Sequence, residues 1–252
     1  MKTKFIRYLI VVICVILILF ALIKVLMPGK KANTYLALGD YLSVSGVLKG
    51  EEINSFSSML GDYLISGNLV KVSNDSYASS SVDSASLLEM ICKDAYSGQD
   101  SGLVSLIRES KYITISVGMN DILQYLRFNS SSQVMEYNEE YIERKLEIFK
   151  QNYYEIIEEI KEINDDVNIY LVGYYCPFTW VEEDNKEEVN KVFKLLNNSI
   201  EEVSELMSVY YVDISEVSKE EHMFNKYQIY LNQIGQEYVF SIFKNNYFSF
   251  DN

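Results

Sequence analysis

Histidine and proline are scarce in this chain of 252 residues, which contains one His and two Pro. A single imidazole and no cluster of His and Cys exclude the usual zinc ligand sets, and scattered carboxylates are expected in an acidic chain. We therefore expect neither a metal site nor a cofactor. Few Pro and 11 Gly leave little material for flexible linkers, while 48% hydrophobic residues indicate a real core rather than disorder. The length suits one good-sized domain.

Cysteine is limited to Cys14, Cys92 and Cys176. Cys14 lies in an apolar run and follows Ile13 rather than the small residue of a lipoprotein cleavage site, so lipidation there is not favoured. Cys92 and Cys176 can pair only if the fold brings them together. Two free, buried thiols are the prediction that we favour.

Acidic residues are missing from residues 1–32, which hold six of the 22 Lys and Arg. The remainder therefore has 16 basic residues (22 less six) against 36 acidic ones, a net charge of −20. Such a body repels phosphate backbones and anionic lipid head groups, so we expect no nucleic-acid partner. The simplest interpretation is a solvated acidic surface.

Residues 8–27 are apolar except for Lys24, which lies near one end of the run. About 20 helical residues span a bilayer core of about 30 Å, and the stem of Lys24 can reach the interface. The alternative is a cleaved signal peptide, but residues 26–29 offer no small-residue cleavage site. We therefore expect a transmembrane anchor at 8–27 after a short basic head at 1–7, then a linker at 28–33 and a domain at 34–252.

Basic residues flank both ends of this apolar run, so charge does not decide its orientation. A head of seven residues is easily retained in the cytoplasm. We favour a single-pass protein of the cell membrane with its domain outside the cytoplasm.

Strand-like and helix-like patterns alternate after residue 33. Apolar runs suited to buried parallel strands occupy 34–38, 68–73, 111–117, 168–174 and 208–213. This alternation predicts an α/β fold, with a parallel sheet covered by helices on both faces and a site beyond the carboxyl ends of its strands.

Two long segments carry helical periodicity. Apolar residues recur every three or four positions from Ile142 to Ile163, and again from Phe193 to Met207. The spacing also suits a coiled-coil seam with a partner helix, but helices beside a parallel sheet more often cover that sheet. We expect these faces to belong to the core.

Three motifs lie at predicted strand ends or before the last helix. They read G-D-Y-L-S at 39–43, G-M-N-D at 118–121 and Y-Q-I-Y-L-N-Q-I-G at 227–235. In order and spacing they resemble the SGNH, or GDSL, hydrolase family of esterases and lipases, whose blocks read G-D-S-L-S, G-x-N-D and D-x-x-H-P-N-x-x-G. The resemblance covers the domain and implies a three-layer α/β/α sandwich, flavodoxin-like, with five parallel strands.

The departures from the family pattern fall on its catalytic positions. Tyr41 stands where the resemblance implies the serine nucleophile, and Tyr227 and Tyr230 where it implies the aspartate and histidine. Ser81 takes the place of an oxyanion-binding glycine, within a residue or two, and Asn120 matches the family asparagine. Asn120 is then more plausibly a structural hydrogen-bonding residue than a working oxyanion donor.

Acyl transfer by this mechanism needs a hydroxyl whose proton a held imidazole removes. A phenol with a pKa of about 10 does not act as a base near neutral pH. The single His222 lies among acidic residues and out of motif register, so we expect it at the surface. A displaced nucleophile at Ser43, with Ser45 nearby, or a tyrosine nucleophile is a less favoured alternative.

The leading hypothesis is a membrane-anchored, SGNH-like pseudoenzyme that lacks the catalytic triad. Tyrosine rings in the former cleft suit stacking on a glycan or anchoring an envelope protein, since the side chain is rigid and amphipathic. The simpler alternative is that the rings plug an unused cleft. The rival hypothesis is an active GDSL-type esterase, lipase or deacetylase with displaced catalytic residues.

Overall fold

The computed structural model describes residues 33–48, 50–96, 98, 102–129, 134–179, 181, 183–225 and 228–249. From Asn33 onward the chain forms a compact unit with its own core. The predicted head and membrane span, residues 1–27, lie outside the described residues. Within the described ranges, no helix is both long and apolar enough to cross a membrane.

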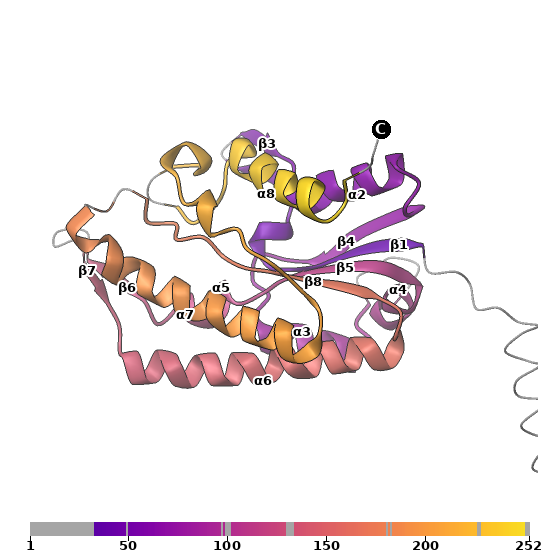
Figure 1. The fold of residues 1–252 in the computed structure, drawn as a ribbon, viewed down its shortest axis with the longest axis horizontal. Helices are drawn as coiled ribbons and strands as arrows, with labels where there is room; N and C mark the ends of the chain where they lie inside the picture. Colours follow the sequence, from indigo (N-terminus) through magenta and orange to yellow (C-terminus); the bar gives the residue numbers. More distant parts are fainter. Residues whose placement is uncertain are drawn as a thin grey trace, which may run out of the picture. The chain divides into compact units, whose positions relative to one another are not determined.

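A parallel sheet of five strands organises the domain, in the order β4-β1-β5-β8-β9 (Figure 1). Its strands are β1 (Thr34–Gly39), β4 (Val72–Ala78), β5 (Ser110–Ser116), β8 (Asn168–Val172) and β9 (Tyr210–Val212). β1 lies second in the sheet and is buried along its whole length, as its continuous apolar run predicts. The predicted α/β class with five parallel strands is confirmed.

Helices cover both faces of the sheet, which gives three layers. α2 (Phe56–Ser66) and α8 (Gln233–Asn246) lie on one side, and α3 (Ser84–Cys92), α6 (Glu139–Ile163) and α7 (Glu183–Met207) lie on the other (Figure 1). The shorter helices are α4 (Leu103–Glu109) and α5 (Met119–Leu123), with 3-10 turns η1 (Tyr41–Ser43), η2 (Ser215–Val217) and η3 (Glu220–His222).

α6 confirms the helical periodicity of its sequence. The side chain of Asn138 accepts a hydrogen bond from the Tyr141 amide and so caps the helix. The apolar positions at 142, 146, 149, 153, 156 and 160 are all buried, and α6 packs against α3 and α7. This face therefore belongs to the core rather than to an unpartnered coiled-coil seam.

The predicted strand at 68–73 is wrong in its position. The chain first closes α2 with a tight turn, in which the amides of Leu69 and Val70 donate to the Leu64 carbonyl and Asn68 has a φ of 55°. β4 begins only at Val72 and is an edge strand, of which Tyr77 alone is buried. The sequence of β4 is largely polar, as an edge strand allows, so it has no apolar run that would indicate a strand.

Two hairpins complete the described part of the chain. The first joins β2 (Gly46–Leu48) to β3 (Glu51–Ile53), and the second joins β6 (Arg127–Asn129) to β7 (Val134–Glu136). The first hairpin follows directly on β1 and η1 and so lies at the carboxyl edge of the main sheet.

Two cysteines lie in the described part of the domain. Cys92 and Cys176 are both free, but only Cys176 is buried. The prediction of two buried thiols is wrong for Cys92, because it ends α3 on an exposed turn.

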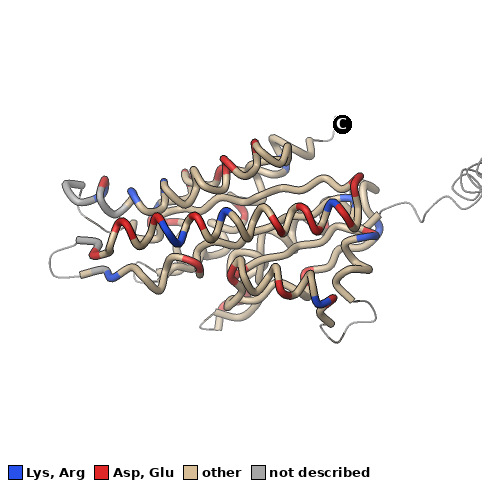
Figure 2. The backbone as a smooth tube through the Cα atoms, turned by 90° about the horizontal axis from the view of Figure 1, so that it is seen from below, with Lys and Arg blue, Asp and Glu red and all other residues tan. Residues whose placement is uncertain are grey.

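Acidic residues are spread along the helices with basic residues between them (Figure 2).

Candidate functional site

The segments that follow β1, β4 and β5 are joined by backbone hydrogen bonds. The Asp40 amide donates to the Ser116 carbonyl at 2.7 Å, and the Ser79 amide donates to the Gly39 carbonyl at 2.9 Å. Gly39 has a φ of 157°, and a Cβ there would lie 2.2 Å from Ser116 Oγ. Only glycine fits this approach, and so the first motif is held firmly against the third.

Asp40 is a completely buried carboxyl with two hydrogen-bond donors. Its Oδ1 accepts from the Leu42 amide at 3.0 Å, which caps η1, and its Oδ2 accepts from the Tyr174 hydroxyl at 2.6 Å. Burial raises the pKa of Asp40 to about 7, although both hydrogen bonds lower it. Neither of these two donors is a cation, so the uncharged acid is favoured up to neutral pH.

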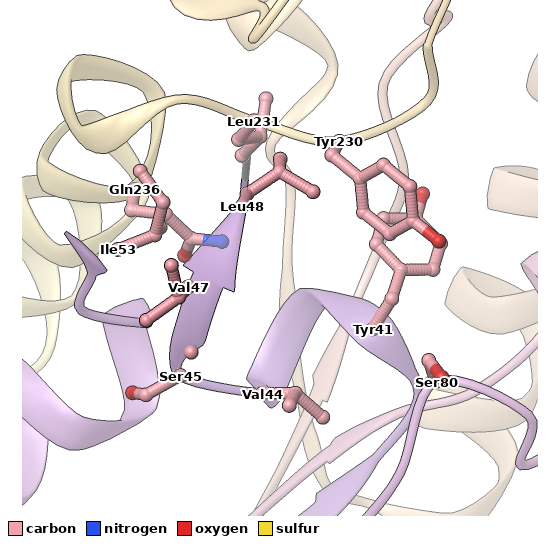
Figure 3. A pocket seen from close by; sticks show the side chains of 11 residues that line it. Tyr41, Val44, Ser45, Val47, Leu48, Ile53, Ser80, Tyr230, Leu231 and Gln236 are labelled. Atoms are coloured by element: carbon pink, nitrogen blue, oxygen red, sulfur yellow. The ribbon is translucent and has the colours of Figure 1, made fainter. Parts of the chain in front are cut away.

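Tyr41 follows Asp40 and packs edge-on against Tyr230. The ring centroids lie 5.3 Å apart with an interplanar angle of 83°. Tyr41 rises from η1 while Tyr230 enters from the opposite side, where the chain approaches α8 (Figure 3). The resemblance implies that these two positions converge at the carboxyl edge of the sheet, and they do so in a geometry that aromatic pairs prefer.

The Tyr41 hydroxyl is buried and makes no hydrogen bond of ordinary geometry within the described residues. Burial, with smaller contributions from Tyr175 and Asp40, raises the pKa of Tyr41 well above its ordinary value. The phenolate that a tyrosine nucleophile would need is therefore strongly disfavoured at neutral pH.

Asn120 uses both hydrogens of its amide within the protein. They are donated to the carbonyls of Ser80 at 3.0 Å and Val82 at 2.8 Å. The side chain therefore ties the start of α5 to the segment after β4. As the contacts stand, it offers no free N–H to an oxyanion.

Two other predicted positions are less informative. Ser81 is exposed, its Oγ lies 3.4 Å from Ser79 Oγ, and it is Ser80 that lines the nearby pocket. Tyr227 lies outside the described residues.

The serines near Tyr41 bond to one another rather than to an imidazole. Ser43 is completely buried, and its Oγ lies 2.8 Å from Ser116 Oγ. Ser45 Oγ lies 2.9 Å from Ser55 Oγ and accepts from the Ser55 amide at 2.9 Å. These contacts give neither hydroxyl a base.

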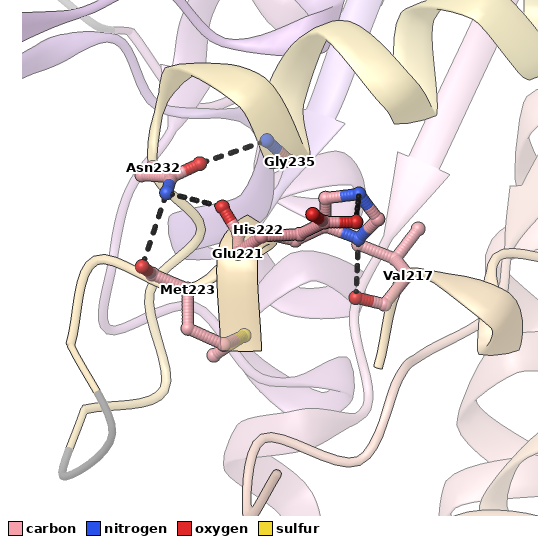
Figure 4. Close-up of polar contacts among 6 residues, drawn as sticks. All are labelled: Val217, Glu221, His222, Met223, Asn232 and Gly235. Carbon is pink, nitrogen blue, oxygen red and sulfur yellow. Dashed lines mark hydrogen bonds and ion pairs between the residues drawn. The ribbon is translucent and has the colours of Figure 1, made fainter. Parts of the chain in front are cut away.

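His222 is 4% exposed, so its predicted surface position is wrong. The η3 turn directs Glu220 and Glu221 outward and the imidazole inward, against the ring of Tyr238 at 5.0 Å. Its Nδ1 donates to the Val217 carbonyl at 2.9 Å, and its Nε2 lies 3.8 Å from a Glu221 carboxylate oxygen (Figure 4). The acidic neighbours of His222 suggested that it is exposed too, but the η3 turn exposes Glu220 and Glu221 and buries His222.

The retained Asn and Gly of the last motif have structural roles. Asn232 accepts from the Gly235 amide and donates to the carbonyls of Glu221 and Met223, so it both caps α8 and holds the preceding turn (Figure 4). A Cβ on Gly235 would lie 2.5 Å from the His222 carbonyl oxygen. The Asn and Gly of the last motif thus fix the conformation of the turn that precedes α8.

A pocket of about 250 Å³ lies beside the Tyr41–Tyr230 pair (Figure 3). Its other walls come from the segment after η1, the β2–β3 hairpin, the start of α8 and the segment after β4. The apolar lining residues are Val44, Val47, Leu48, Ile53 and Leu231. Among the described residues, no group of three or more His, Cys, Asp or Glu side chains could hold a metal ion.

The model of the GDSL-like lipase/acylhydrolase family matches residues 54–238, more than half of the chain. The chain belongs to this family. The match begins after Tyr41, so the assignment of Tyr41 to the nucleophile position of the GDSL fold depends on its place at the end of β1. No curated protein matches the chain.

Several solved structures share this fold. The lipase Lip_vut3 from a goat rumen metagenome is 18% identical, with a TM-score of 0.64 over 83% of this chain and 95% of that one. A variant of Axe2, an acetyl-xylooligosaccharide esterase from Geobacillus, is 13% identical, with a TM-score of 0.61 over 88% and 96% of the two chains. A putative GDSL-like lipase from Parabacteroides merdae is also 13% identical, with a TM-score of 0.58 over 84% and 94%. At these identities the likeness concerns the fold.

Two residues that shape this site, Asp40 and Gln236, could not be assigned their roles from the sequence. Asp40 belongs to the first motif, but its burial against Tyr174 depends on a residue 134 positions away. Gln236 joins α8 to η1 and α2 by donating to the Leu42 carbonyl and accepting from the Phe56 amide. Neither contact has a local sequence signal.

Proposed function

We propose that this GDSL-family protein is a membrane-tethered pseudoenzyme whose former active-site cleft binds an envelope protein or glycan. The observation that carries the proposal is the Tyr41–Tyr230 pair. By the motif resemblance it stands where the family has a serine and a histidine, and its ring centroids lie 5.3 Å apart with Tyr41 only 5% exposed. The rings fill the space that a substrate carbonyl would need, and among the contacts of the described residues none brings an imidazole or carboxylate base to this pair.

The surrounding contacts support the same conclusion. The amide of Asn120 is engaged by Ser80 and Val82, and Ser43 is buried against Ser116. The Nδ1 of His222 donates to the Val217 carbonyl, and its Nε2, the nitrogen that could act as a base, faces Glu221 at 3.8 Å. An esterase with displaced groups needs a hydroxyl, an imidazole and free donors together, and these residues point each of them elsewhere.

The purified domain, residues 33–252, should show no turnover of short-chain nitrophenyl esters. The reason is that the nucleophile, base and oxyanion donors of the family mechanism are absent or engaged. A spectrophotometric assay beside a catalytically intact family esterase checks this, with heat-denatured domain as the blank. Turnover that disappears in Ser43→Ala or Tyr41→Phe would contradict the proposal and would identify the displaced nucleophile.

The tether is proposed from the apolar residues 8–27. The full-length protein should remain in the membrane fraction after carbonate extraction, because about 20 apolar residues insert stably. Protease added to intact cells should digest the domain if it faces outward. A soluble protein that begins near residue 30 would show cleavage instead of anchoring, and complete protection would reverse the orientation.

A further inference from the structure

A second pocket, of about 320 Å³, lies beyond the carboxyl ends of β8 and β9. Its described lining comes from the segment after β8, from α7 and from the segment after β9. It shares no described lining residue with the pocket beside Tyr41. Ligands of parallel α/β sheets bind beyond the carboxyl ends of the strands, so this position suits a binding site.

The walls of the second pocket are held together by hydrogen bonds. The Cys176 amide donates to Ser218 Oγ at 2.8 Å, which joins the segment after β8 to the segment after β9. Asn197 of α7 accepts from the Tyr174 amide and donates to the Tyr174 carbonyl, both at 2.7 Å. The pocket is therefore built by the fold, and a ligand does not have to order it.

Two lysines from different elements line this pocket. Lys194 lies on α7 and Lys219 precedes η3, and both are exposed. Within the described residues, neither ammonium group takes part in an ion pair or a hydrogen bond. From residue 33 onward the chain has more than twice as many acidic as basic residues. Two cations left without a carboxylate at one pocket of such a domain indicate an anionic ligand.

Uncharged polar groups lie deeper in the lining than the two lysines. Asn190 and Ser215 are half-buried, and in the described part of the chain neither side chain makes a hydrogen bond. Ser218 Oγ accepts one backbone hydrogen bond and, within the same residues, donates none. Exposed Glu216 adds a carboxylate that accepts hydrogen bonds. These groups suit a ligand that has several hydroxyl groups.

The volume suits a ligand larger than a simple ion. A cavity of about 150 Å³ holds benzene. By that scale, about 320 Å³ holds roughly a dozen non-hydrogen atoms. An inorganic phosphate ion fills less than half of that space, whereas the phosphate ester of a small sugar fills most of it.

The charges of the lining favour a phosphate over a carboxylate. A phosphate monoester has a charge of about −1.5 to −2 at pH 7, which matches two ammonium groups better than the single charge of a carboxylate does. Lysine commonly binds phosphate as a point charge, while bidentate recognition of a carboxylate is typical of arginine. The carboxylate of Glu216 opposes the anion, so both lysines are needed to outweigh it.

We propose that this pocket binds the phosphate monoester of a small sugar or polyol. The phosphate lies beside Lys194 and Lys219, and the hydroxyl groups bond to Asn190 and Ser215. The site is separate from the Tyr41–Tyr230 pair, so the inference goes beyond the proposed function and does not rest on it.

Titration calorimetry of ribose 5-phosphate into the domain, residues 33–252, tests the proposal. This unit contains its own core, and circular dichroism checks that each variant is folded. In about 0.15 M salt, charges more than about 8 Å away are largely screened, so the distant carboxylates of the domain affect binding little. Saturable binding of ribose 5-phosphate is expected, with inorganic phosphate roughly tenfold weaker and no saturation by ribose.

Lys194→Gln and Lys219→Gln should each weaken the binding of ribose 5-phosphate roughly fivefold or more, because each removes one of the two cations. Lys71→Gln is the matched control, since Lys71 is exposed before β4 and does not line the pocket. All three variants change the net charge equally, so a difference between them reports the pocket alone.

Three results would overturn the proposal: no saturable binding to the folded domain, unchanged binding in either pocket variant, or an equal loss in Lys71→Gln. Binding of ribose or inorganic phosphate as tightly as ribose 5-phosphate would also overturn it, because the ligand would then need only one of its two parts. Turnover of nitrophenyl esters, in contrast, would contradict the proposed function and leave this site unaffected. The failures of the two proposals are therefore distinguishable.

Discussion

Replacing Asp40 with Asn is expected to remove a loss of stability that the wild-type domain undergoes as the pH rises from about 4 to about 7. The carboxyl is completely buried, and burial raises its pKa from 3.8 to about 7. That difference corresponds to roughly 4 kcal/mol. Asn retains both contacts, since its oxygen can accept from Leu42 and its amide can donate to the Tyr174 oxygen.

The sign follows from proton binding. Between pH 4 and pH 7 the unfolded chain has lost the Asp40 proton while the folded domain still holds it, so folding is favoured by low pH. The contribution is complete below about pH 4 and is lost as the pH passes the folded pKa of about 7. Asp121, whose pKa burial raises to about 6, acts in the same direction and is present in both proteins.

Urea denaturation of both domains at intervals between pH 4 and pH 8 measures the effect. The difference in free energy of unfolding between the variant and the wild type should grow with pH and level off above about pH 7. Tyr174→Phe removes a donor to the carboxylate and should shift the wild-type decrease to higher pH. Parallel curves for wild type and Asp40→Asn would show that Asp40 is already ionised in the folded domain.

Buried strands and helices with a regular apolar pattern could be predicted from the sequence. That pattern lies in the element's own residues and hardly depends on the elements that pack against it. The apolar run of β1 and the repeat along α6 each match one buried face or strand. β4 could not be found in this way, because an edge strand pairs on one side and does not need apolar residues. The apolar residues at 69 and 70 close α2 instead.

The site was only partly predictable, for a similar reason. A site beyond the carboxyl ends of the strands could be predicted, and Tyr41 and Tyr230 meet there because those strand ends and the loops that follow them share one edge of the sheet. The pocket also needs the β2–β3 hairpin, whose strands have three residues each and carry no clear alternation. His222 was misplaced because its burial depends on Tyr238, in a helix further along the chain.

Tyr41→Ser, which places a serine where the motif resemblance implies the family nucleophile, is expected to destabilise the domain by about 3 kcal/mol. The ring is 5% exposed and packs on Tyr230, so its removal leaves a cavity of the kind that costs about 3–5 kcal/mol for Phe→Ala. Loss of a buried hydroxyl that makes no hydrogen bond of ordinary geometry among the described residues offsets part of that cost. Tyr41→Phe, which removes only that hydroxyl, should be neutral or stabilising by about 1 kcal/mol.

Urea denaturation at pH 7 measures both variants, with Tyr96→Ser as the control. Tyr96 is 67% exposed, so its replacement should change the free energy of unfolding by no more than about 0.5 kcal/mol. If Tyr41→Ser cost no more than the control, the ring would lie in an open cleft rather than in the core. A large cost would instead mean that packing opposes a serine at this position. The single substitution then loses stability without gaining a base, because triad members act as a unit.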